Sequence, residues 1–236
     1  DETEEDECYS EDGECYSEDG ECYSEEEEEA NVVHTNQVNK TMNDYLRMLE
    51  NNYPTEEQKV AIHEILCRRL CILLGKGGTG KTAGVVRHVI KIAQKLGWEW
   101  VLLAPTHAAK KRGQVGVMGE EDGTDKVREA HFGTINSEVY MYLPEGATEA
   151  TEMESKLLRR MKEIDEGKNM VIILDESSMV SRNWYASLFK HCVDDSRIRL
   201  VLVGDVDQLS PVGAGQVFRD AVESGLVPVL KLKRNF

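Results

Sequence analysis

A glycine-rich loop with one lysine and one threonine is the part of this sequence best suited to hold a polyphosphate. The loop, residues 75–82, follows the apolar run Leu70–Leu74 and precedes a helical pattern over Ala83–Leu96. Glycines leave room for backbone N–H groups to turn towards phosphates. In this motif the lysine, Lys81, reaches the β- and γ-phosphates and the hydroxyl of Thr82 holds Mg²⁺. The sequence therefore predicts a nucleotide site made by Gly75, Lys76, Gly77, Gly78, Thr79, Gly80, Lys81 and Thr82.

Two adjacent acids, Asp175 and Glu176, end a second apolar run, Val171–Leu174. In P-loop enzymes an acid at this position holds Mg²⁺ through its waters. A carboxylate one residue later can polarise the water that attacks the γ-phosphate. An acid pair at a strand end is common in isolation, but its place about ninety residues after a P-loop favours a catalytic pair.

Two glutamines are candidates for contacts with the nucleotide. Gln208 follows the apolar run Leu200–Val203, where an amide can bond both the γ-phosphate and its water. The alternative is a turn in which neighbouring aspartates cap the backbone. Gln58 lies three residues after Thr55, the spacing of a helix capping box, and its amide could equally read the edge of adenine. From the residues alone, both alternatives stay open for each glutamine.

Short apolar runs alternate with amphipathic patterns along the chain. Their order predicts an α/β fold with a mostly parallel central sheet and helices on both faces. The phosphate site then belongs at the carboxyl ends of the strands. The expected strands are Leu70–Leu74, Trp100–Ala104, Val171–Leu174, Leu200–Val203 and Val227–Leu230. The expected helices are Met42–Asn52, one that starts at Pro54, Ala83–Leu96, Thr106–Arg112, Arg182–His191 and Gln216–Glu223.

Residues 143–168 interrupt this alternation. Within them Leu157, Leu158, Met161 and Ile164 fit one face of a helix. The segment is therefore predicted to be an insertion outside the sheet that forms a surface helix, with contact to a partner or to DNA as the alternative.

The acidity of the chain is concentrated at its N-terminus. Residues 1–29 carry 17 of the 44 acidic residues and neither Lys nor Arg, so the remaining 27 acids face 28 bases. A seven-residue repeat runs through this segment, with Glu7–Gly13 followed by Glu14–Gly20. Repelling charges and a glycine in these repeats predict a disordered acidic tail over residues 1–30, followed by a globular domain over 31–236. Two roles stay open for the tail: mimicry of nucleic acid in a basic groove of the same molecule, and recruitment of a basic protein partner.

Features that the sequence lacks argue against several classes of protein. Its six cysteines include no C-x-x-C pair, and it has no secretory signal and no apolar stretch long enough to span a membrane. Zinc fingers, disulfide frameworks and membrane proteins are therefore disfavoured. We expect an intracellular protein with reduced thiols.

Six motifs in order resemble the first RecA-like motor domain of superfamily 1 DNA helicases. The resemblance covers roughly residues 50–236 and is strongest to the RecD/TraA/Dda branch, which translocates 5′ to 3′. Several ordered motifs are far more specific than any one of them. The motifs are Gln58, Gly75–Thr82, Ala104–Lys110, Thr134–Ser137, Asp175–Met179 and Gly204–Gly213.

The resemblance implies a role for each matching residue, with ATP and Mg²⁺ as cofactors and single-stranded DNA as partner. It implies that Gln58 reads adenine, which favours the second of its two alternatives. It also implies the catalytic residues. Lys81 contacts the phosphates, Asp175 and Thr82 hold Mg²⁺, and Glu176 is the general base. Gln208 couples the γ-phosphate to DNA, and Arg234 reaches the γ-phosphate. The implied DNA contacts are Pro105, Thr106, His107, Lys110, Thr134 and Asn136.

Three departures from the family pattern accompany these matches. Asn136 stands where related sequences often have His, and Ser210 replaces one proline of a usual pair. Segment 143–168 is predicted to be helical, whereas relatives often place a β-hairpin in this region. The resemblance covers one RecA-like domain, and the second RecA-like domain is expected to be absent from this chain. Because a second domain supplies an arginine finger and half of the DNA track, we expect this chain to bind ATP–Mg²⁺ and to unwind poorly alone. One rival hypothesis is a non-motor module that binds nucleotide and nucleic acid and has a partner-recruiting tail. Another is a P-loop kinase or an unrelated NTPase.

Overall fold

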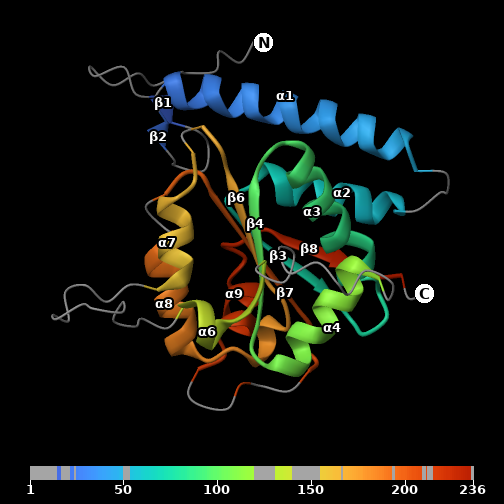
Figure 1. Cartoon of the computed structure of the whole chain (residues 1–236), viewed down its shortest axis with the longest axis vertical. Helices are drawn as coiled ribbons and strands as arrows, with labels where there is room; N and C mark the ends of the chain where they lie inside the picture. The colour runs from blue at the N-terminus through green and yellow to red at the C-terminus, as the bar shows by residue number, and fades with distance from the viewer. Residues whose placement is uncertain are drawn as a thin grey trace, which may run out of the picture.

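The computed structural model of the chain describes residues 15–16, 22–23, 25–49, 54–119, 131–139, 155–165, 167–192, 195–208, 211 and 215–234. Within these residues a six-stranded sheet lies between two groups of helices (Figure 1). Among the described helices, none combines the length and apolarity needed to cross a bilayer.

The sheet is parallel throughout, with strand order β5-β4-β6-β7-β3-β8. All residues of β6 and β7 are buried, as expected for strands covered on both faces. The predicted α/β fold is confirmed, although one strand, β5, was not anticipated and β8 starts later than expected. The strands are β3 (Leu70–Gly75), β4 (Glu99–Ala104), β5 (Phe132–Thr134), β6 (Met170–Leu174), β7 (Ile198–Gly204) and β8 (Val229–Leu232).

Helices cover both faces of the sheet (Figure 1). Buried side chains of α1, α2, α3 and α4 join the apolar cluster on one face, and those of α6, α7, α8 and α9 join the cluster on the other. The helices are α1 (Glu25–Arg47), α2 (Glu56–Cys67), the π-helix η1 (Lys81–Val86), α3 (Arg87–Lys95), α4 (His107–Met118), α6 (Ile135–Val139), α7 (Lys156–Lys162), the 3₁₀-helix η3 (Ser177–Met179), α8 (Arg182–Cys192) and α9 (Val217–Ser224).

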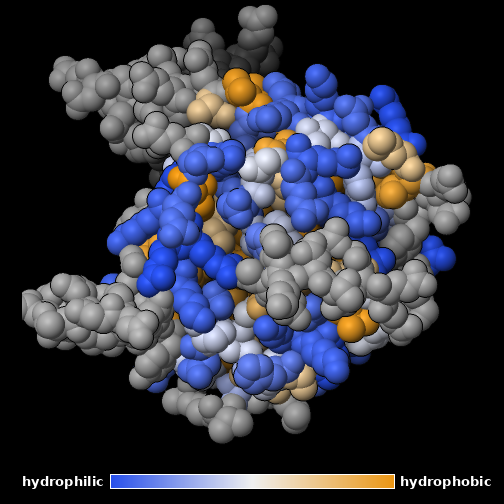
Figure 2. All heavy atoms as spheres, viewed as in Figure 1, coloured by the Kyte–Doolittle hydropathy of each residue, from blue (hydrophilic) through white to orange (hydrophobic). Residues whose placement is uncertain are grey.

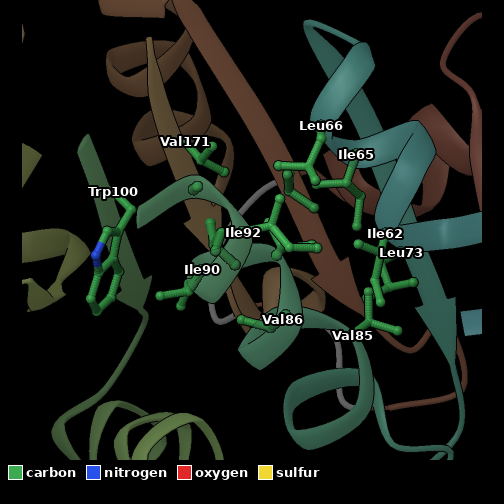
Figure 3. Close-up of a cluster of buried hydrophobic side chains, with 14 of the residues drawn as sticks. Ile62, Ile65, Leu66, Leu73, Val85, Val86, Ile90, Ile92, Trp100 and Val171 are labelled. Carbon is green, nitrogen blue, oxygen red and sulfur yellow. The ribbon is translucent and has the colours of Figure 1, made fainter. Parts of the chain in front are cut away.

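Strand β3 contributes side chains to the apolar clusters on both faces of the sheet. Cys71 and Leu73 point into the cluster beneath α2 and α3, whereas Ile72 belongs to the opposite cluster. Figure 3 shows Leu73 among side chains of α2 and of the helix that follows the glycine loop, including Ile62 and Val85. The strand and the helix on either side of the loop are therefore fixed by buried apolar contacts.

The N-terminal region differs from the expectation. Helix α1 begins at Glu25, inside the segment predicted to be disordered, and ends at Arg47, before the Asn52 expected from the sequence. Val38, Met42 and Tyr45, spaced four and three residues apart, are buried against α2 and α3, which explains why the helix docks. Residues 50–52 of the expected helix lie outside the described residues.

Two short strands also lie within the acidic repeat. Strands β1 (Cys15–Tyr16) and β2 (Cys22–Tyr23) pair antiparallel, where the repeat was expected to be disordered. The rest of the segment before α1 lies outside the described residues.

Helix α7 forms inside the predicted insertion, at Lys156–Lys162. It adds no strand to the sheet, as expected, but it is more than a surface helix. Leu157 and Met161, together with Ile164 beyond its end, are buried in the cluster shared with α6 and α8. Residues 143–154 and 166 lie outside the described residues.

Among the described residues, few large apolar side chains are exposed. On the face shown in Figure 2, hydrophilic residues predominate and apolar ones appear as separate small patches. Val33, Met48 and Leu226 are among the exposed apolar residues. Scattered exposure of this kind is normal for a folded domain.

Candidate functional site

The glycine loop joins β3 to η1 in a conformation that few residues other than glycine adopt. Gly78 and Gly80 have φ angles of +80° and +77°, in the left-handed region. The ammonium group of Lys81 folds back over the loop and donates to the carbonyl oxygens of Gly75 (2.5 Å) and Lys76 (3.0 Å). The structure thus places the predicted lysine at the mouth of the loop, where it would meet phosphate oxygens.

An open cavity of about 330 Å³ adjoins this loop. It lies at the carboxyl ends of β3, β7 and β8, the sheet edge at which a phosphate site was expected. Lys76 of the loop forms an exposed ion pair with Asp207 (3.2 Å) across it. A side chain at Gly77 or Gly78 would meet nothing within 4 Å, so the loop borders open space. These features fit a bound polyphosphate.

Asp175 ends β6 and is 7% exposed. Burial and the neighbouring Glu176 raise the pKa of its carboxyl group to about 6, against the opposing influence of Lys81 and Arg112. One oxygen, Oδ1, accepts a hydrogen bond from the backbone N–H of Glu176 (2.9 Å). A buried carboxylate whose charge is costly is stabilised by a cation, so Asp175 fits the role of a magnesium ligand.

Glu176 is the single described residue other than glycine with a positive φ, at 53°. Such a conformation costs on the order of 1 kcal/mol and is often found at functional sites. Two hydrogen bonds hold the turn that follows: the Ser177 hydroxyl donates to the Leu174 carbonyl (2.6 Å) and the Tyr185 hydroxyl to the Ser177 carbonyl (2.8 Å). The Glu176 carboxylate pairs with Arg112 of α4 at 3.4 Å.

Gln208 follows a tight turn after β7. The Asp205 carboxylate accepts a hydrogen bond from the Asp207 N–H (3.0 Å), so the aspartate-capped turn considered above is present. Gln208 itself lines a small cavity between this turn and α9, together with Ser178, whose buried hydroxyl has no hydrogen-bond partner among the described residues. Residues 209, 210 and 212–214, which include Ser210, lie outside the described residues.

Gln58 takes part in the capping box and retains a second, unused group. Its Oε1 accepts from the Thr55 N–H (3.0 Å) and its own N–H donates to the Thr55 hydroxyl (3.4 Å). The side chain is 1% exposed, yet Nε2 has no hydrogen-bond partner among the described residues. An unsatisfied buried donor costs about 1–3 kcal/mol, which a ligand acceptor would relieve. Gln58 therefore fits an adenine contact as well as a helix cap.

Arg234 follows β8 at the same edge of the sheet. In the pairing of β8 with β3, Leu232 lies opposite Gly75, the first residue of the glycine loop. The Lys233 N–H donates to the Glu57 carboxylate of α2 (3.0 Å) and so fixes the path of the chain just before Arg234. The arginine is exposed near the loop that would hold the phosphates.

The residues expected to contact DNA gather on β4 and β5 and the helices that follow them. Ala104 and Thr134 are register partners at the carboxyl ends of these strands. Thr106 caps α4 by accepting from the Ala109 N–H (3.1 Å), and Thr134 is buried and hydrogen-bonded to Ser137. The two threonines thus have structural roles. Pro105, Thr106, His107, Lys110 and Asn136 are exposed or half-buried.

Helix α4 packs closely against Asp175 and Thr82, on two sides of the candidate nucleotide site, a feature that the sequence patterns did not reveal. An ideal Cβ on Gly113 would lie 3.5 Å from Oδ2 of Asp175, and one on Gly116 would lie 2.8 Å from Cγ2 of Thr82. The glycines allow this approach because they have no side chain. Both glycines lie beyond the helix expected over Thr106–Arg112, because α4 continues to Met118.

The donor set suits Mg²⁺ bound together with a nucleotide. Within the described part of the chain, no three His, Cys, Asp or Glu side chains cluster as a metal site. Mg²⁺ commonly binds through one or two protein oxygens, substrate phosphates and water. Thr82 and Asp175 are the residues that would supply these protein oxygens, and each lies against a glycine of α4.

Comparison with known proteins shows the family to which this chain belongs. The model of the AAA domain family matches residues 54–236. RecD, a RecBCD enzyme subunit from Mycolicibacterium smegmatis, is 33% identical over 176 residues, which cover 71% of this chain and 30% of RecD. The ATP-dependent RecD2 DNA helicase of Deinococcus radiodurans is 32% identical over 161 residues, covering 68% of this chain and 19% of RecD2.

A probable conjugal transfer protein TraA from Sinorhizobium fredii is 29% identical over 168 residues, covering 70% of this chain and 12% of TraA. A solved Pif1 helicase from Candida albicans matches with a TM-score of 0.48 at 20% identity, over 77% of this chain and 40% of that chain. The chain thus spans less than a third of the length of the RecD relatives. It belongs to the AAA domain family, as a motor domain of the RecD/TraA-like branch of superfamily 1B helicases.

Proposed function

We propose that this chain binds and hydrolyses ATP with Mg²⁺ and serves as the motor domain of a 5′-to-3′ DNA helicase. The observation that carries the proposal is the convergence of the glycine loop, the Asp175–Glu176 pair and α4 at one sheet edge. The relatives it resembles include an ATP-dependent DNA helicase, RecD2, and a subunit of the RecBCD enzyme, RecD, and their longer chains extend well beyond the matched region. Unwinding is therefore proposed for a polypeptide that also contains a second RecA-like domain.

The proposed hydrolysis assigns one task to each polar group. Lys81 and the loop N–H groups would hold the β- and γ-phosphates. Thr82 and Asp175 would hold Mg²⁺, which when bound neutralises charge on the phosphate oxygens. Glu176 would accept a proton from the attacking water, and Gln208 would contact the γ-phosphate side. Arg234 would add positive charge at the same edge of the sheet.

We infer that single-stranded DNA passes over the carboxyl ends of β4 and β5. Pro105, His107 and Asn136 lie there, with Lys110 one turn into α4. Lysine neutralises backbone phosphates, and exposed polar groups contact sugar and phosphate without reading sequence. Oligo(dT) binding by fluorescence anisotropy, weakened in Lys110→Gln, would support this assignment. Equal affinity for the two proteins would contradict it.

The acidic residues 1–24, ahead of α1, are proposed to bind a basic protein partner. They contain 12 of the 17 acids of the N-terminal segment and no Lys or Arg, so they present negative charge alone. Deletion of residues 1–24 is the test. The proposal is supported if oligo(dT) affinity stays unchanged, and mimicry of nucleic acid on the same chain is supported if that affinity rises.

Gln58→Ala is expected to weaken ATP binding about 5–10-fold and to abolish a preference for ATP over GTP, because it removes the orphan Nε2 donor. Thr55→Ala is the matched control. It removes the other half of the capping box at a cost of ~0.5–2 kcal/mol in stability but keeps the amide. Competition of ATP and GTP against a fluorescent nucleotide measures both. An equal loss of preference in the two variants would show that only the helix cap matters.

Asp175→Asn is expected to stabilise the nucleotide-free protein while removing Mg²⁺-dependent ATP binding. The pKa of Asp175 is about 6 in the folded protein and near 3.8 when exposed, so the folded state binds the proton more tightly. The penalty of ionising this group is therefore full above pH 6 and disappears as the pH falls towards 4. We expect a gain of ~1–3 kcal/mol at pH 7.5 and about half as much at pH 5. Urea unfolding of the wild type and of Asp175→Asn at the two pH values measures this gain in the free energy of unfolding. A gain that does not change with pH would contradict the raised pKa of Asp175.

A further inference from the structure

Helix α4 connects the proposed DNA track with the nucleotide site. Its N-terminus is capped by Thr106, beside Pro105 and His107 of the track. Its middle carries Arg112 and Gly113, which reach the acids at the end of β6. One element of 12 residues therefore touches both sites.

The position of α4 over the nucleotide site is held on two sides. The missing side chains at Gly113 and Gly116 let the helix approach Asp175 and Thr82. Arg87, the first residue of α3, donates from Nε to the carbonyl oxygens of Gly116 (3.1 Å) and Val117 (2.8 Å). A shift of α4 would consequently change its contacts with both Asp175 and Thr82.

The pair between Arg112 and Glu176 is the polar link at this junction. Nη2 of Arg112 lies 3.4 Å from Oε1 of Glu176, with the two side chains 69% and 22% exposed. An ion pair this exposed is weak and is easily exchanged for another partner. A guanidinium group binds a carboxylate or a phosphate with the same fork of donors. The competing partner with the right chemistry is a DNA phosphate.

We infer that Arg112 is a positioning residue that restrains the Glu176 carboxylate in the DNA-free protein and releases it by moving to a phosphate of single-stranded DNA. This inference rests on the proposed function, because it assigns Glu176 as the base for ATP hydrolysis. In the DNA-free protein the guanidinium group occupies Oε1 of Glu176, so this oxygen is not available to contact the attacking water. Once Arg112 contacts DNA, Glu176 is free to polarise water. The pair thus makes hydrolysis depend on DNA.

Arg112→Gln tests this inference through the ATPase activity. The variant is expected to raise the kcat without DNA about two- to fivefold, as the loss of an exposed ion pair allows, with an unchanged KM for ATP. The rate at saturating oligo(dT) should stay the same, so that stimulation by DNA shrinks by the same factor. Added salt should raise the DNA-free rate of the wild type but not that of the variant, since salt screens the pair.

Lys111→Gln is the matched control for charge on the same helix. Lys111 is exposed and has no ion pair among the described residues. The ATPase rate of Lys111→Gln without DNA should therefore match that of the wild type. A DNA-free rate of Arg112→Gln that equals that of the control would overturn the inference. A lower rate accompanied by a lower melting temperature would also overturn it, because Arg112 would then be merely structural.

A binding cycle tests the pair without any hydrolysis. Glu176→Gln is expected to tighten oligo(dT) binding about two- to fivefold in the wild-type background, because Arg112 no longer has a competing partner. In the Arg112→Gln background the same substitution should give no gain. Equal gains in both backgrounds would overturn the inference. A wild-type ATPase that ignores DNA would instead contradict the proposed function, and the binding cycle would still decide whether the pair competes with DNA.

Discussion

Glu176→Gln is expected to lower the kcat of ATP hydrolysis by about 10²–10⁴, the usual contribution of a positioned general base. The ATP affinity should remain within about threefold of the wild type, since the phosphates are bound by the loop and by Lys81. The fold should be retained, because the carboxylate makes its one described ion pair with an exposed arginine. Single-turnover hydrolysis and binding of a fluorescent ATP analogue measure the two effects separately.

Glu163→Gln is a suitable control for this substitution. Glu163 is an exposed acid at the end of α7, remote in the fold from the β6 turn, and its loss should leave kcat unchanged. A Glu176→Gln protein that keeps more than about a tenth of the wild-type kcat would rule out Glu176 as the general base.

Lys81→Ala is expected to weaken ATP–Mg²⁺ binding about 10–100-fold, because it removes charge-assisted hydrogen bonds to the phosphates. The same change removes the ammonium bridge to the carbonyl oxygens of Gly75 and Lys76, so the empty loop should also become less ordered. Isothermal titration with ATP–Mg²⁺ measures the affinity. The kcat/KM for ATP hydrolysis should fall by at least the same factor as the affinity.

Lys95→Ala removes a positive charge from the last turn of α3, at the far end of the helix that follows the loop. It should bind ATP–Mg²⁺ like the wild type. Equal affinity of the Lys81→Ala and Lys95→Ala proteins would show that the glycine loop does not bind phosphate.

Local patterns explain why the nucleotide-binding residues could be predicted from the sequence. The loop at 75–82 and the acids at 175–176 each follow an uninterrupted apolar run, and such runs form the buried parallel strands observed. The resemblance to superfamily 1 helicases then ordered the remaining motifs. Each of these signals lies within a few residues of the group that it predicts.

Features that depend on distant contacts were not predicted. Strand β5 has three residues, one of them Gly133, and its strand conformation depends on pairing with β4. Helix α1 starts among consecutive glutamates, and its stability comes from Val38, Met42 and Tyr45 packing on α2 and α3. In both cases tertiary contacts, rather than local preference, decide the structure.

The link between the two sites was hidden for the same reason. Arg112 and Glu176 are 64 residues apart in the sequence and meet only because β4 and β6 are neighbours in the sheet. Gly113 and Gly116 disfavour a helix by local propensity, yet they lie in α4 because their small size permits close packing. Function at this junction depends on packing that a linear pattern does not encode.

The most direct test of this account is the steady-state ATPase rate of the chain with and without saturating oligo(dT), at fixed salt and Mg²⁺. We expect a Mg²⁺-dependent rate that rises several-fold with the oligonucleotide and that is lost in Lys81→Ala. A rate that stays flat when DNA is added would contradict a motor domain and would favour a nucleotide-binding module instead. A rate unaffected by Lys81→Ala would contradict the nucleotide site itself.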